Sequence, residues 1–329
     1  MSPRTRIIVI AVAAAALAAG GTVALAMITS SPESGDKART EALKGVPPLV
    51  LDLGVRDDPE ARALRKAERL YNGKQRAAAG RIFARYRSPE AQVGAALAAW
   101  PDGSLARLEQ LATARPRSSL VLLHLGFARL WSGRGANAGD AWREAARAQP
   151  DSASAQRADD ALHPRFPSGQ PFFVPSFSPP SRLDRLSPPR QLAALALGAR
   201  RADVRAKLLY GLALQRLGHR VSAQRQYDEA ARLAPANPEA RVAAAVVRFD
   251  KGNPSAAFSR LGPLTPRFPK APTVRFHLGL LLLWLARVQP GSVEEGKRQL
   301  RLARAEGPNS PLGREATRLL DGLENVRTG

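Results

Sequence analysis

The 329-residue chain contains no cysteine, which excludes disulfide bonds, thiolate nucleophiles, iron–sulfur clusters and cysteine-based zinc sites. Aromatic residues make up only 5% of the chain, and β-branched runs typical of strands are scarce. The stretches rich in Ala, Leu, Arg and Glu favour helix because these side chains lose little entropy there. With 44% hydrophobic residues the chain is long enough to bury a real core. The sequence therefore predicts an all-α fold.

Acidic residues are also few, since 28 Asp and Glu face 50 Lys and Arg and leave a formal charge of +22. Nearly all the basic residues are Arg, which GC-rich coding alone would favour. The other interpretation is attraction to anionic lipid headgroups, acidic envelope polymers or an acidic partner. Nucleic acid is not expected as a partner, because the Arg residues are spread along the chain without interleaved aromatics on one element.

The residues that usually carry catalysis form no recognisable site. The only four His include His124 and His277, which occupy equivalent His-Leu-Gly motifs with no His, Asp or Glu four residues away. Adjacent acidic pairs such as Asp159-Asp160 diverge by about 100° on a helix and do not converge on one atom. We therefore expect structural His residues, no catalytic residue, no metal ligand and no cofactor, and so no enzyme.

The N-terminus contains a candidate membrane anchor. Residues 7–28 carry no charge, and as a helix these 22 residues rise about 33 Å, enough to cross a bilayer core. Arg4 and Arg6 precede the run, which places residues 1–6 in the cytoplasm. The alternative is a signal peptide cleaved after the small-x-small sequence Ala24-Leu25-Ala26, which would release a secreted protein.

Residues 29–58 are mixed in charge, contain Pro and Gly, and are predicted to form a tether. With a single-pass anchor, everything after residue 28 would lie outside the cytoplasm.

An internal repeat is the strongest signal in the sequence. One spacing of 7, 5, 4, 3 and 5 residues connects Gly126, Gly133, Ala138, Trp142, Ala145 and Pro150. The same spacing connects Gly211, Gly218, Ala223, Tyr227, Ala230 and Pro235. Adding 34 gives Ala245, Gly252, Ala257, Leu261, Leu264 and Pro269. Small residues let two antiparallel helices approach, the large residue fills the gap, the Gly makes the turn and the Pro ends the second helix.

Further copies are less regular. One begins at Gly279 and has extra residues in its turn, around Gln289 to Glu295. An earlier one keeps only its second half, at Ser104, Leu108, Leu111 and Pro116. Before it, residues 60–86 are helical by composition with a break at Asn72-Gly73.

The 34-residue period, with Gly in the first helix and Ala, Trp or Tyr, Ala and Pro in the second, resembles the tetratricopeptide repeat (TPR) family. The resemblance implies an α-solenoid in two arrays, residues 59–162 and 191–310, closed by a capping helix and tail at 311–329. It also implies a non-enzymatic scaffold or adaptor that binds partner peptides or helices in a groove lined by first helices. That groove would include Leu123, Phe127, Trp131, Arg205, Leu212, Arg216, Val246, Phe249, Phe276, Leu280 and Trp284.

A second functional hypothesis comes from the basic charge. It is an accessory subunit of an envelope enzyme, or a binder of anionic polymer or lipid headgroups.

Residues 163–190 interrupt the two arrays and are too rich in Pro for helix. Their Phe172, Phe173 and Phe177 are unusual for a linker, and an exposed cluster of three rings would favour aggregation. We expect burial against a solenoid surface. Two placements stay open: the rings plug an array end, or the segment lies along a groove as a built-in ligand.

Overall fold

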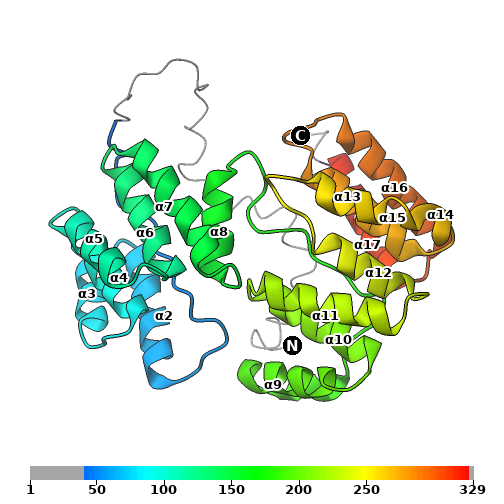
Figure 1. Ribbon diagram of the computed structural model, residues 1–329, viewed down its shortest axis with the longest axis horizontal. Helices are drawn as coiled ribbons and strands as arrows, with labels where there is room; N and C mark the ends of the chain where they lie inside the picture. The colour runs from blue at the N-terminus through cyan, green and yellow to red at the C-terminus, as the bar shows by residue number, and fades with distance from the viewer. Residues whose placement is uncertain (1–40, 326–329) are drawn as a thin grey trace. The chain divides into compact units, whose positions relative to one another are not determined.

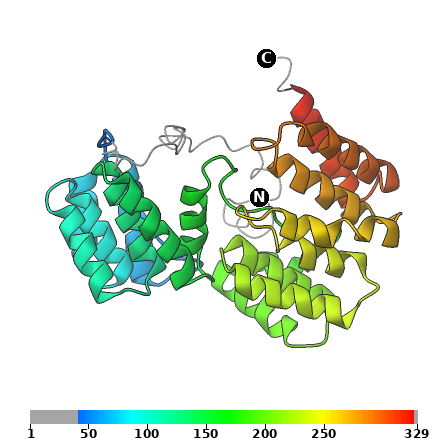
Figure 2. The same cartoon turned by 45° about the horizontal axis from the view of Figure 1, so that its top comes forward.

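The computed structural model describes residues 41–325, and every regular element in that range is a helix. These residues divide after Leu162 into two compact parts, here the first unit (41–162) and the second unit (163–325), as Figures 1 and 2 show. The predicted cytoplasmic end, the anchor at 7–28, the start of the tether and the last four residues lie outside the described range. Within that range no helix has the length and apolarity to cross a bilayer.

The first unit consists of three helical hairpins and one further helix. Its last helix, α8, packs on both helices of the third hairpin. The pairs are α2 (Pro59–Asn72) with α3 (Arg76–Phe83), α4 (Pro89–Ala98) with α5 (Ser104–Ala114), and α6 (Ser119–Trp131) with α7 (Gly135–Ala148), followed by α8 (Ala153–Leu162).

The second unit repeats this order after two short additions, η2 (Ser181–Arg185) and α9 (Pro188–Ala199). Three hairpins and a closing helix follow, so both units are TPR-like arrays of α-hairpins. The elements are α10 (Val204–Arg216) with α11 (Arg220–Leu233), α12 (Pro238–Val246) with α13 (Ser255–Leu261) and α14 (Leu264–Arg267), α15 (Pro272–Trp284) with α16 (Ser292–Glu306), and α17 (Pro311–Asn325).

Local sequence explains where the helices begin. Several start at a Pro, whose missing N–H costs nothing in the first turn. Five helices, three of them among those that start at a Pro, follow a capping side chain: Asp58, Ser88, Ser118, Asp203 and Asn237 each accept a hydrogen bond from a first-turn N–H.

The predicted role of the small residues in the hairpins is confirmed. A Cβ at Gly211 would lie 2.5 Å from Cε1 of Tyr227, and one at Gly126 would collide with the indole of Trp142. The turn glycines Gly133 and Gly218 have φ of 75° and 82°, a left-handed conformation that other residues rarely adopt. Close helix approach and the tight turn therefore both depend on glycine.

Two hairpins differ from the pattern expected from sequence. In the third copy a single second helix was expected through Ala257, Leu261 and Leu264, but Gly262-Pro263 divides it into α13 and α14 because Pro cannot donate to the helical ladder. The earlier copy, recognised only by its second half, has a complete first helix, α4. Gly94 of α4 lies directly against Phe83 of α3, where a Cβ would meet the ring at 2.6 Å.

Candidate functional site: two grooves that hold extended segments

Residues 170–178, here the second segment, form an extended stretch between α8 and α9 (Figure 1). Side chains of the second unit bind its backbone directly. Gln215 donates from Nε2 to the carbonyl of Pro171 at 2.9 Å and accepts from the N–H of Phe173 at 3.3 Å. The N–H of Val174 donates to Nε2 of His277 at 2.8 Å, and that of Ser176 donates to Glu239 at 2.8 Å.

Phe173 anchors this segment. Its side chain is completely buried, stacked on His277 with ring centroids 5.4 Å apart and edge-on to Tyr227 at 5.7 Å. Phe172 and Phe177 are half-buried. Arg205 places its guanidinium 4.4 Å from the centre of the Phe177 ring.

The side chains that hold the second segment come mainly from first helices of successive hairpins: Arg205 and Gln215 on α10, Glu239 on α12 and His277 on α15. The resemblance to the TPR family implies a groove lined by first helices. Of the two placements left open by the sequence, the structure therefore supports the built-in ligand over the plug at an array end.

Residues 46–53, here the first segment, were expected to belong to the tether, but the structure places them in the core of the first unit. Alternate residues Leu49, Leu51 and Leu53 are buried, as in a strand with one face on a core. The N–H of Val50 donates to Nε2 of His124 at 3.2 Å, and Tyr71 donates its hydroxyl to the carbonyl of Pro47 at 2.7 Å. Burial of the alternating leucines explains why this part of 29–58 is not a free tether.

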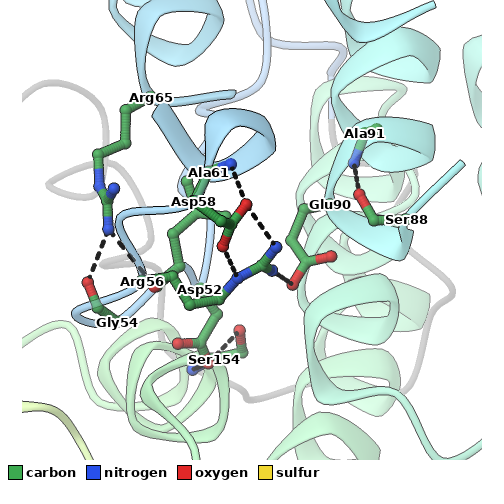
Figure 3. A network of polar contacts seen from close by, with 11 residues as sticks. Asp52, Gly54, Arg56, Asp58, Ala61, Arg65, Ser88, Glu90, Ala91 and Ser154 are labelled. Carbon is green, nitrogen blue, oxygen red and sulfur yellow. Dashed lines mark hydrogen bonds and ion pairs between the residues drawn. The ribbon is translucent and has the colours of Figure 1, made fainter. Parts of the chain in front are cut away.

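Polar contacts hold the end of the first segment (Figure 3). Asp52 accepts hydrogen bonds from the backbone N–H and the hydroxyl of Ser154, at the start of α8. Downstream, Arg56 pairs with Asp58 at 2.9 Å and lies 3.9 Å from Glu90 of α4. The segment is thus attached to helices from the beginning, middle and end of the first unit.

The two equivalent histidines each accept a backbone N–H of the extended segment in their unit. Nδ1 of His124 lies 2.7 Å from the carbonyl of Leu120, and Nδ1 of His277 lies 2.7 Å from that of Thr273. Each Nδ1 must therefore carry the proton, which leaves Nε2 to accept the segment's N–H. Burial lowers the pKa of both rings from 6.5 to about 4, against the opposing effect of the backbone hydrogen bond.

The residues predicted to line the groove lie mostly inside the units. Arg205 is exposed and holds the second segment, Arg216 is half-buried, and Phe249 packs edge-on to Phe166, just before that segment. Contact of any of them with a partner stays a prediction. The buried members are Leu123, Phe127, Trp131, Leu212, Val246, Phe249, Phe276, Leu280 and Trp284.

Sequence reasoning missed the polar residues that hold backbone: Tyr71, Gln215, Glu239 and the Nε2 atoms of the two histidines. The one available signal was the equivalence of His124 and His277, which was correctly taken as structural but not connected to the segments. Among the described residues no three His, Asp or Glu gather as metal ligands would. The predictions of no metal and no cofactor remain predictions.

Comparisons with known proteins add little to this geometry. No protein-family model and no curated protein matches the chain. Among solved structures, the crystal structure of yeast Tom70 is similar at a TM-score of 0.31 and 12% identity, covering 80% of this chain and 47% of the Tom70 chain. The chain thus spans about half the length of that protein. A TM-score this low carries no inference about partners, and the hairpin arrays themselves define the TPR-like fold.

Proposed function

We propose that this chain is a non-enzymatic scaffold that binds partner proteins through extended peptide segments in its grooves. One observation supports this: in both units, side chains of first helices hydrogen-bond the N–H and C=O groups of an extended chain. Backbone groups are common to every peptide, so such a groove suits extended segments, with side-chain pockets adding selectivity.

A photo-crosslinking experiment tests this function. A photoreactive residue at Arg205, exposed on α10 and in contact with the second segment, should give adducts with other proteins in the native membrane. The matched control is Arg232, exposed on the second helix α11. Excess synthetic peptide of residues 168–181 should suppress the adducts at Arg205. Equal labelling at both positions, or labelling within the chain alone, would contradict a groove-binding scaffold.

Membrane anchoring with an extracytoplasmic repeat domain is part of the same proposal. Its support is the uncharged run of residues 7–28 behind Arg4 and Arg6. The full-length protein should stay with the membrane fraction after a carbonate wash. A soluble mature form beginning near Met27 would show that the run is a cleaved signal and that the protein is secreted.

The formal charge of +22 favours a second candidate function, binding of anionic polymer or lipid headgroups. Such binding must weaken steeply with salt, since it depends on the release of counterions. Titration with an acidic polymer at two salt concentrations separates the candidates, because a groove that binds backbone and apolar groups should respond little to salt.

A further inference from the structure

One four-residue pattern, Pro-x-(Leu or Phe)-Val, occurs twice in the sequence and nowhere else in it. Both copies lie within the two segments, as Pro47-Pro48-Leu49-Val50 and Pro171-Phe172-Phe173-Val174. The arrays that hold them also share an identical run at a contact position, the His-Leu-Gly motifs of His124 and His277. A pattern that recurs only where a groove binds it indicates what the groove recognises.

Three of the four positions make the same contact in both units. The Pro carbonyl accepts a hydrogen bond, from the Tyr71 hydroxyl in the first unit and from Gln215 in the second. The third side chain is buried, with Leu49 1% and Phe173 0% exposed. The Val N–H donates to Nε2 of His124 or His277.

The helices that supply these contacts are equivalent as well. Tyr71 and Gln215 lie on the first helix of the first hairpin, α2 or α10, whereas both histidines lie on the first helix of the third, α6 or α15. The Val-to-His separation is 74 residues in one unit and 103 in the other. The additional stretch with η2 and α9 accounts for most of the difference.

Each position has a chemical reason. Pro favours the extended backbone and leaves its carbonyl free to accept. A large apolar side chain fills the buried pocket at the third position. The fourth residue must have an N–H, because Nε2 of the neutral His ring is an acceptor and needs a donor. The second position is tolerant, since Pro48 and Phe172 are both half-buried.

We propose that the groove of the second unit is a binding site for an extended Pro-x-(Leu or Phe)-Val segment of a partner protein, which takes the place of residues 170–178. This rests on the proposed scaffold function, and it adds the sequence class that the groove accepts. The second segment is the exchangeable one because Phe173 is its single buried large apolar side chain, and residues 174–178 are half-buried or exposed, whereas the first segment buries leucines along its whole length.

The test uses the full-length chain and a fluorescent peptide of residues 168–181. Phe173→Ser should weaken the bound segment and raise affinity for the peptide at least about tenfold over the wild type, in which the attached segment competes at high effective concentration. Phe172→Ser is the matched control and should change affinity little. Val174→Pro, which removes the N–H that donates to His277, is a second variant that leaves the Phe173 side chain in place and should raise affinity as well.

Peptide chemistry tests each position. An N-methyl group at the residue matching Val174 removes the donor to His277 and should lower affinity about tenfold or more, whereas N-methylation at the residue matching Phe172 should not. Replacing the residue matching Phe173 by Ser should abolish binding. Its replacement by Leu should retain binding, as the first segment implies.

A further experiment uses the wild-type chain, so its result does not depend on whether the variants fold. Excess peptide should speed hydrogen exchange of residues 170–178 in the wild type, and the Val N-methyl peptide should not. No acceleration, or equal effects of the two N-methyl peptides, would overturn the inference. Failure here together with adducts at Arg205 would leave the scaffold function intact and show only that the groove reads another sequence. Peptide binding without adducts at Arg205 would support the sequence preference of the groove and contradict the scaffold function.

Discussion

In the first unit three large apolar side chains of the bound segment, Leu49, Leu51 and Leu53, are buried, whereas Phe173 is the single large apolar side chain of the second segment that is buried. Charged side chains hold both segments, since Glu68 accepts from the N–H of Leu51 at 2.7 Å and Glu239 accepts from that of Ser176 at 2.8 Å. Both segments also use the same bond from a Val N–H to a buried His.

The difference in buried apolar side chains suits the two segments to different roles, although the same kind of hydrogen bond holds both. A segment that buries several side chains becomes part of the hydrophobic core and cannot leave without unfolding its unit. A segment with one fully buried ring resembles a bound peptide. The following predictions test this contrast, from the largest expected effect to the smallest.

The largest effect is expected from Leu49→Ala. Removing this buried side chain should lower the stability of the first unit by about 2–5 kcal/mol, the range for a leucine in a packed core. Phe173→Ala should cost the second unit less than the roughly 3–5 kcal/mol typical of a buried phenylalanine, because the segment can detach and the array stays folded. Urea unfolding followed by hydrogen exchange reports each unit separately. If Phe173→Ala lowered the stability of the second unit by the full amount, about 3–5 kcal/mol, typical of a buried phenylalanine, the two segments would not differ in how firmly they are held.

Acid should weaken both units through their histidines. Each His is neutral when folded, with a pKa of about 4, and takes up a proton below about 6.5 once unfolded. Stability is therefore complete above pH 6.5 and falls as the pH drops toward 4, by about 3 kcal/mol per histidine in total.

The measurement compares unfolding midpoints of the wild type with those of His277→Gln and His124→Gln between pH 7 and pH 4. Glutamine can still accept the Val N–H but does not titrate in this range. The advantage of the wild type should shrink as the pH falls. Parallel pH profiles would mean that the histidines do not hold the segments as neutral acceptors.

Replacing the glycine at the closest helix contact should destabilise the two units about equally. Gly211→Ala forces a Cβ to within 2.5 Å of the Tyr227 ring and should cost about 1–3 kcal/mol, and Gly126→Ala should do the same against Trp142. The control is Gly198→Ala on α9, where the new Cβ would lie 3.6 Å from that of Ala206 and stability should rise slightly. Thermal unfolding of the three variants is sufficient. An unchanged midpoint for Gly211→Ala would contradict the hairpin assignment.

The smallest effect is expected at two equivalent helix caps. Asp203→Ala removes the cap of α10 and should cost about 1 kcal/mol. Asp58 caps α2 and also binds Arg56, whose hydrogen bond holds the pKa of this carboxyl at about 2. Asp58→Ala should therefore lower the melting temperature of its unit more than Asp203→Ala does. An equal change would show that the ion pair adds nothing.

The sequence predicts the hairpins well because their determinants are local. Gly126, Gly133, Trp142 and Pro150 act within one hairpin, so their spacing is sufficient to place two helices and a turn. The segments were harder to place because they are defined by residues far along the chain. Pro-rich extended stretches have the composition of linkers, and the signals that distinguish them from a tether are short: the alternation of Leu49, Leu51 and Leu53, and the repeated Pro-x-(Leu or Phe)-Val pattern.

The same long separation has a consequence for synthesis. His277 follows Val174 by 103 residues, so at about 5–20 residues per second the ribosome makes the groove on the order of 5–20 s after the segment that fills it. During this interval Phe173 lacks the His277 ring on which it stacks. When α15 is complete, the new groove is empty and any matching peptide nearby competes with the chain's own segment in their first encounter. The end of synthesis is therefore the time at which a partner peptide faces the least competition from the chain's own segment.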